Sequence, residues 1–198
     1  MKRLIILLLA LFAVPAFAGP AGPGTAAVKS ANEKISGLLK QKVTAGSKDE
    51  KELAGKVAGS VRDFLDIDEL GKRAMADQWS KLSSAQQQEF LSTLRDLIED
   101  NYVKGLRSNL EYTVDYTGEA TDAGSLVVTT QINTKRHNRP YKIEVDYVVK
   151  KVGDKYKAWD VKTDGVGLVE NYREQFNKIV EKDGFAGLIA KMKKKQQG

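Results

Sequence analysis

The chain has 198 residues, a net charge of +6 at pH 7, a single histidine and no cysteine. The lack of cysteine excludes a disulfide framework, thiolate metal sites and cysteine nucleophiles. The isoelectric point is about 9.3, but no basic run is interleaved with aromatic residues, so we expect no nucleic-acid partner.

The first eighteen residues are typical of a secretory signal peptide. Lys2 and Arg3 precede an apolar run over residues 4–14, and Ala16-Phe17-Ala18 forms a small-x-small cleavage site. The run is too short for a transmembrane helix, and an uncleaved anchor is the alternative. Cleavage after Ala18 removes two positive charges and leaves a soluble, exported chain of charge +4. We expect a flexible leader over residues 19–28 and a single domain over residues 29–198.

The first half of the mature chain shows helical periodicity, with apolar residues at steps of three and four. Two pairs, Asp66 with Glu69 and Ser83 with Gln86, fit capping boxes at helix starts. The four predicted stripes are Ala31, Ile35, Leu38, Leu39 and Val43; Leu53, Val57, Val61, Phe64 and Leu65; Ile67, Leu70, Ala74 and Met75; and Phe90, Leu94, Leu97, Ile98, Tyr102 and Leu106.

The periodicity then changes from 3.6 to 2, which predicts four strands joined by short turns. The inward-facing residues are Tyr112, Val114 and Tyr116; Leu126, Val128, Thr130 and Ile132; Tyr141, Ile143, Val145, Tyr147 and Val149; and those of a fourth strand over residues 156–161. Two further helices are predicted over residues 166–180 and 185–192. The sequence therefore predicts an α+β fold, in which about six helices cover one face of a four-stranded antiparallel meander.

Few side chains are suited to catalysis. His137 lies in a polar turn with no acid beside it. Asp160, between Trp159 and Val161, fits either a general acid with a raised pKa or, more simply, a carboxylate that accepts hydrogen bonds from its neighbours. The acidic residues between 63 and 69 fit helix caps and match no EF-hand loop. We therefore expect neither an enzyme nor a metal site.

The segment Gly165-Val166-Gly167 follows a strand and precedes a helix, as a dinucleotide-binding turn does. That fingerprint requires a third small residue at the position of Glu170, and its strand belongs to a parallel βαβ unit. Both requirements fail here. We interpret the glycines as a corner that turns the chain from the sheet into a helix.

Two stretches carry a resemblance to a known family. "FLDIDELGKRAMADQWSKLSSAQQQEFLSTLRDLIEDNYVKGL" and "WDVKTDGVGLVENYREQF" resemble the MlaC (toluene-tolerance auxiliary) family, over roughly residues 61–192. The sequence departs from the family pattern at Ala76, where glycine is common, and at Gly167, where serine is common. The landmarks are Trp79, Phe90, Tyr102, Asp160-Val161, Asn171-Tyr172-Arg173 and Phe176.

The resemblance implies a periplasmic phospholipid carrier that has no cofactor besides the transported lipid. Its implied partners are an inner-membrane ABC transporter complex with its lipid-binding subunit and an outer-membrane lipoprotein complex. The acyl chains are expected in an apolar pocket between sheet and helices. Positions that face inward are predicted to line this pocket: Trp79, Phe90, Leu94, Leu97, Ile98, Val128, Ile132, Ile143, Val145, Tyr147, Val166, Val169, Tyr172 and Phe176.

Three other functions fit the same pattern. One is a carrier of a different apolar ligand, such as a hopanoid or a free fatty acid. Another is a periplasmic adaptor with a filled core that acts only through protein contacts. A small hydrolase of related shape is the third, and it requires an acid–base pair that we do not find in the sequence.

Overall fold

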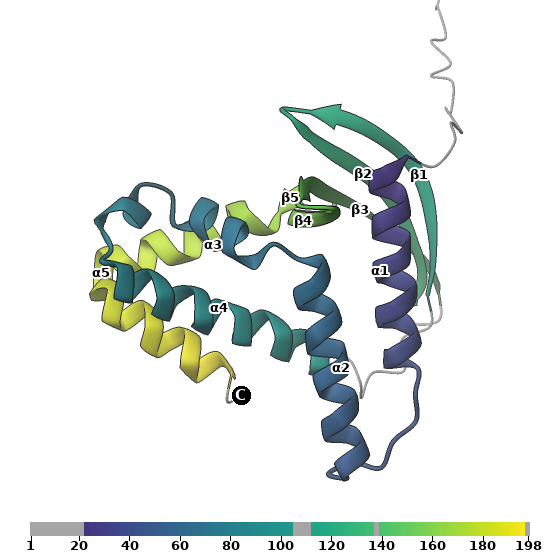
Figure 1. The fold of residues 1–198 in the computed structure, drawn as a ribbon, viewed down its shortest axis with the longest axis horizontal. Helices are drawn as coiled ribbons and strands as arrows, with labels where there is room; N and C mark the ends of the chain where they lie inside the picture. The colour runs from purple at the N-terminus through teal and green to yellow at the C-terminus, as the bar shows by residue number, and fades with distance from the viewer. Residues whose placement is uncertain (1–21, 105–111, 137–138, 197–198) are drawn as a thin grey trace, which may run out of the picture.

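A computed structural model describes residues 22–104, 112–136 and 139–196 (Figure 1). The expected signal peptide, Leu106 and His137 lie outside these residues. In chain order the elements are α1 (Pro23–Leu39), α2 (Lys48–Phe64), α3 (Ile67–Met75), the 3-10 helix η1 (Ala76–Lys81), α4 (Ser84–Lys104), β1 (Thr113–Asp122), β2 (Ser125–Arg136), β3 (Arg139–Val152), β4 (Lys155–Thr163), β5 (Val166–Gly167) and α5 (Leu168–Gln196).

The α+β fold and the antiparallel meander are confirmed, but both counts were wrong. The described sheet has five strands in the order β1-β2-β3-β4-β5, because Val166 and Gly167 pair with the end of β4. The described residues form five α-helices instead of six. The element α5 contains both of the last two predicted helices, which meet at Gly184, where the backbone is not helical (φ 68°, ψ −177°).

The N-terminal boundaries also differ from expectation. Helix α1 begins at Pro23, so residues 23–28 of the expected leader are helical. Proline fixes φ near the helical value and suits the first helical position, which explains the early start. The helix ends at Leu39, so Val43 lies beyond it.

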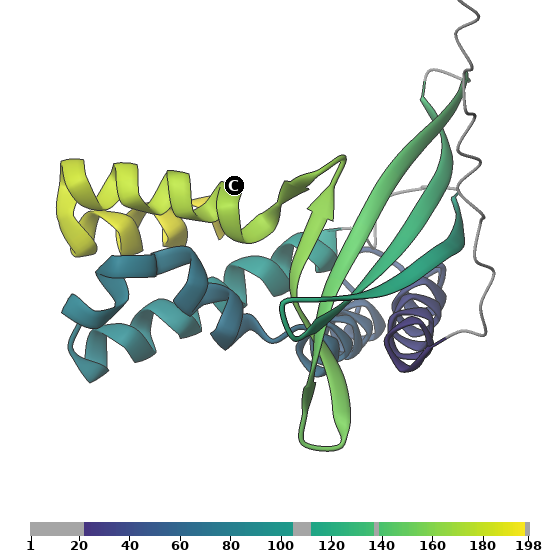
Figure 2. The same ribbon diagram turned by 90° about the horizontal axis from the view of Figure 1, so that it is seen from above.

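The helices form two groups instead of one covering layer. In Figure 2, α1 and α2 lie against one side of the sheet, while α3, α4 and α5 extend away from its β4–β5 edge. Phe90 and Phe176 meet edge to face within the second group, with ring centroids 5.4 Å apart. Leu70, Leu94 and Leu188 are fully buried. The second group therefore has a dense core of its own, continuous with the core under α1 and α2.

Helix α1 is anchored to the sheet at its first turn. Its N-cap residue, Gly22, has no side chain to satisfy the free backbone N–H groups there. The carboxylate of Glu119 on β1 replaces that cap: it accepts hydrogen bonds from the Gly24 and Thr25 amides and the Thr25 hydroxyl, at 3.3, 2.6 and 2.7 Å. Gly24 lies against Val128, so α1 covers β2 closely.

Each of the two glycines at the corner after β4 is needed for a different physical reason. Asp164 and Gly165 have positive φ values of 48° and 82°, the combination needed for a two-residue hairpin turn into β5. Gly167 instead lies beside Asp160: a Cβ there would come within 2.8 Å of the Asp160 Oδ2 atom. The interpretation of these glycines as a corner agrees with this geometry.

Asp160 connects the sheet to α5. It is only 6% exposed, and its Oδ1 atom accepts hydrogen bonds from the Val161 and Val169 amides at 2.9 and 3.0 Å. Val169 is the second residue of α5, so the carboxylate caps that helix and complements its dipole. This geometry favours the simpler interpretation of Asp160 as a structural acceptor.

We predict that Gly167→Ala destabilises the protein by about 2 kcal/mol. The new methyl group displaces the Asp160 carboxylate and weakens the charge-assisted bond that caps α5. Gly118→Ala is the matched control, since nothing lies within 4 Å of its Cβ position; we expect a change of at most about 0.5 kcal/mol. Urea denaturation of both variants measures the difference, and equal midpoints would contradict the assigned role of Gly167.

The backbone at the end of α3 carries local strain. Ala76 has φ 45° and ψ −124°, a conformation that favours glycine and costs other residues about 1–3 kcal/mol. We predict that Ala76→Gly stabilises the protein by about 1 kcal/mol, after allowance for the greater freedom of glycine in the unfolded chain. Ala54→Gly, within α2, should instead destabilise by about 1 kcal/mol. Thermal melts of both variants test the opposite signs.

Candidate functional site

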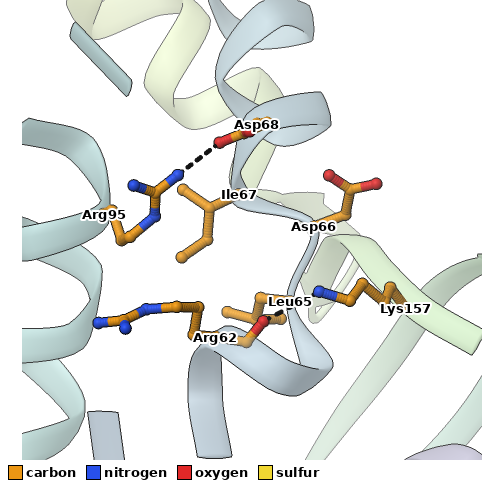
Figure 3. Close-up of a pocket in the computed structure, with 7 residues that line it drawn as sticks. All are labelled: Arg62, Leu65, Asp66, Ile67, Asp68, Arg95 and Lys157. Carbon is orange, nitrogen blue, oxygen red and sulfur yellow. Dashed lines mark hydrogen bonds and ion pairs between the residues drawn. The ribbon is translucent and has the colours of Figure 1, made fainter. Parts of the chain in front are cut away.

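A small charged recess lies at the junction of α2 and α3, between α4 and β4 (Figure 3). Arg95 pairs with Asp68 at 2.8 Å, and the Lys157 ammonium donates to the Arg62 carbonyl at 3.1 Å. The Arg62 guanidinium points toward α4, where it binds Glu99 through two hydrogen bonds of 2.6 and 2.8 Å. The lining residues are Arg62, Leu65, Asp66, Ile67, Asp68, Arg95 and Lys157.

This charged recess does not suit a phospholipid. Its volume is about 100 Å³, whereas pockets for small-molecule ligands usually measure about 300–1,000 Å³. Its basic side chains already have acidic or carbonyl partners. None of the predicted pocket residues contributes to it. We therefore assign it a structural role, in which ion pairs join α2, α3 and α4.

The structure separates the predicted lining residues into two sets. The first set lies mainly in the core between the helices beyond the β4–β5 edge: Trp79, Phe90, Leu94, Leu97, Ile98, Val169, Tyr172 and Phe176. The second set lies on the sheet face that α1 and α2 cover: Val128, Ile132, Ile143, Val145 and Tyr147. Val166 belongs to neither, because it is 59% exposed on β5; its expected inward orientation was wrong.

The two sets differ in how some of their members are packed, although Val128 of the second set is fully buried in the main core cluster and Tyr147 packs against it. In the first, Phe90 lies edge to face with Trp79 at 6.3 Å and with Phe176 at 5.4 Å, so these rings fill the space beside one another. In the second, Ile132 and Ile143 face each other across β2 and β3 and remain half-buried. Val145, their neighbour, is 5% exposed and yet lies outside the main core cluster.

Tyr116 of β1 and Tyr147 of β3 lie on the same face of the sheet. The phenols of Tyr102 of α4 and Tyr112, just before β1, lie near that of Tyr147, and the Tyr172 phenol of α5 lies near that of Tyr102. We call these five residues the tyrosine cluster. Asn32 of α1 connects two of its members. The Tyr147 hydroxyl donates to the Asn32 side-chain Oδ1 atom at 3.4 Å, and the Asn32 side-chain Nδ2 donates to the Tyr116 hydroxyl at 3.2 Å. Elements distant in sequence thus bring their phenols to one place.

Burial affects the hydroxyl groups of Tyr147 and Tyr102 in this cluster. Burial raises the pKa of Tyr147 far above its ordinary value, and the nearby phenols of Tyr102, Tyr116 and Tyr112 raise it further. Burial also raises the pKa of Tyr102, with a smaller contribution from the Tyr112 and Tyr172 phenols. The hydroxyls of Tyr147 and Tyr102 therefore stay neutral at pH 7.

Tyr102 combines two properties that seldom occur together. Its side chain is 37% exposed, yet its hydroxyl is desolvated enough to raise its pKa. The candidate ligand site is the sheet face that carries the half-buried Ile132 and Ile143, their neighbour Val145, and Tyr116 and Tyr147.

Sequence reasoning found only part of this site. Tyr147 and Tyr172 were among the predicted lining residues, while Tyr102, Tyr112 and Tyr116 were placed on inward-facing stripes but not selected. Their repeated occurrence at inward positions is a signal that would have found them. Asn32 was missed, because its role depends on two strands more than eighty residues away.

Two negative findings apply to the described ranges only. No helix there is long and apolar enough to cross a membrane. Within the same residues, no three histidine, aspartate or glutamate side chains are grouped so that they could hold a metal ion.

Comparisons with known proteins relate this chain to one family and to one solved structure. The family model described as "MlaC protein" matches residues 29–194. A search of curated proteins gives no match. Among solved structures, the phospholipid-binding protein from Ralstonia solanacearum, in complex with a phospholipid, is similar in fold: the TM-score is 0.71 at 23% sequence identity, covering 89% of this chain and 98% of that one. Because the family model matches most of the sequence, the chain belongs to the MlaC family.

Proposed function

We propose that this protein is a soluble periplasmic carrier of phospholipid. The observation that carries the proposal is membership of the MlaC family over residues 29–194. The similar Ralstonia protein, which holds a phospholipid in its structure, supports it. The N-terminal pattern of residues 1–18 supports export, with cleavage after Ala18.

A carrier is needed because phospholipids cross water extremely slowly. Burial of one methylene group is worth about 0.8 kcal/mol, so roughly thirty methylenes cost on the order of 24 kcal/mol when exposed together. A protein that shields the acyl chains removes most of this barrier. Its affinity needs only to match that of a bilayer approximately, since a much tighter complex would not release the lipid.

The sheet face near the tyrosine cluster is the best location for the acyl chains. Ile132, Ile143 and Val145 are apolar there, and the first two remain accessible. The rings of Phe90 and Phe176, by contrast, already pack edge to face against each other. We infer that the lipid lies between the sheet and the helices on this side.

The proposed transfer partners follow from the family. They are an inner-membrane ABC transporter complex with its lipid-binding subunit and an outer-membrane lipoprotein complex. Among the described residues, Asp160 is the candidate acid that the sequence offered, and it is engaged in capping α5. Carriage of the intact phospholipid is therefore the function that the site supports best.

Extraction of the purified mature protein with organic solvent, followed by mass spectrometry, tests this function. We expect close to one phospholipid per protein. A hopanoid or fatty acid in its place would favour the other carrier. If nothing is extracted and delipidated protein takes up nothing from phosphatidylglycerol vesicles, the protein is not a carrier and the adaptor is favoured.

We predict that Val145→Trp lowers phospholipid uptake at least about tenfold, because the indole occupies space that the acyl chains require. The protein should remain folded, since Val145 lies outside the main core cluster. Val152→Trp is the matched control, because Val152 is 39% exposed at the end of β3; its uptake should equal that of the parent. Circular dichroism and vesicle uptake measure both properties. A folded Val145→Trp variant with full uptake would place the lipid elsewhere.

A further inference from the structure

The end of the β2–β3 hairpin is strongly basic. Residues 133–143 include Lys135, Arg136, Arg139 and Lys142 but no aspartate or glutamate. The side chains of Lys135, Arg139 and Lys142 are exposed. Within the described ranges, no carboxylate forms an ion pair with any of these three. This end of the sheet therefore carries a local excess of positive charge.

The charges surround the end of the hairpin and are not confined to one side of it. Successive side chains of a strand point to opposite faces of the sheet. Lys135 and Lys142 therefore lie on one face, and Arg139 lies on the other. In Figure 2, β2 and β3 project away from the helices at this end. A partner that reaches all three charges must approach the hairpin from its end.

Side-chain exposure falls step by step along β3 on the face that carries Arg139. Arg139 itself is exposed, Tyr141 is 38% exposed, Ile143 is half-buried and Val145 is 5% exposed. Ile132 of β2 lies opposite Ile143 and is half-buried as well. An aromatic ring with a polar tip thus stands between basic side chains and an apolar part of the sheet.

This order of side chains matches the layers of a phospholipid bilayer. Anionic headgroups attract lysine and arginine, and tyrosine is enriched where headgroups meet hydrocarbon. An acidic protein would complement the charges, but a folded surface presents its carboxylates in fixed places. A fluid layer of anionic headgroups reaches basic side chains on both faces of the hairpin at once. A membrane is therefore the partner that fits this surface better.

We propose that the end of the β2–β3 hairpin, formed by Lys135, Arg139, Tyr141 and Lys142, docks on an anionic phospholipid membrane. The inference rests on the proposed carrier function, because a carrier must meet a membrane to exchange lipid, and it adds the surface that makes the contact. Docking in this way places Ile143 directly behind the headgroups. Acyl chains that pass from the bilayer to the sheet face then stay beside apolar side chains.

Vesicle sedimentation tests the role of the charges. The mature parent protein should sediment with vesicles that contain about one-third phosphatidylglycerol, and about 0.5 M salt should release it. Arg139→Gln/Lys142→Gln should weaken this binding at least about tenfold, because each basic side chain near such a surface contributes roughly fivefold. Lys194→Gln/Lys195→Gln is the matched control, since it removes the same charge from exposed positions of α5; it should bind as the parent does.

A tryptophan reporter tests the position of the contact. Tyr141→Trp places an indole at the proposed surface, and brominated phosphatidylglycerol quenches indole fluorescence only at close range. We expect the fluorescence that this variant adds to that of the parent's two tryptophans to be quenched by such vesicles. Val152→Trp is the control, because Val152 lies at the opposite end of β3 and is 39% exposed; its added fluorescence should persist.

The outcomes separate docking from the function on which it rests. Full binding by the folded Arg139→Gln/Lys142→Gln variant, or loss of binding in the α5 control, would show that the hairpin is not the docking surface. A parent protein that does not bind anionic vesicles overturns the inference and favours an acidic protein as the partner of this end. Melting temperatures establish that each variant is folded.

Lipid carriage is measured separately, by mass spectrometry of the lipid extracted from the protein. If the parent carries phospholipid without sedimenting with vesicles, docking is refuted and the carrier function stands. If the parent sediments with anionic vesicles but carries no lipid, the carrier function fails and the docking surface stands.

Discussion

The buried carboxylate of Asp160 determines how the two parts of this molecule are joined. It accepts hydrogen bonds from Val161, the next residue of its own strand, and from Val169 at the start of α5. Because a carboxylate that is 6% exposed requires such donors, the first turn of α5 must lie against β4. The direction of α5, and of the helices packed on it, follows from that contact. Gly167 is required there because a side chain would displace the carboxylate.

This junction explains why the helical core and the sheet face differ. The helices beyond the β4–β5 edge bury their stripes against one another and form a dense core around Phe90, Leu94 and Phe176. The far end of the sheet face is left to α1 and to partly buried side chains such as Ile132 and Ile143. The architecture therefore separates a densely packed helical core from a less densely packed sheet face.

Much of this fold could be predicted from periodicity, and the exceptions have physical reasons. The stripes of α2, α3 and α4 and the alternation in β1 to β4 were sufficient to predict an α+β fold. A strand of two residues, such as β5, is too short to show any alternation. The break between the last two predicted helices falls at Gly184, whose backbone leaves the helical region inside α5. The helical start at Pro23 could not be recognised in the sequence, because the small residues around it fit a loop as well as a helix.

The candidate site was less predictable, because periodicity identifies the inward side of an element and not what that side meets. Leu94 and Val145 both face inward, but only Leu94 is surrounded by the main core cluster. Asn32 is polar and lies on a helix, so its sequence context resembles that of a solvated surface residue. Its importance comes from Tyr116 and Tyr147, which the chain brings to it only through the pairing of β1, β2 and β3. Contacts of this kind arise from tertiary structure alone.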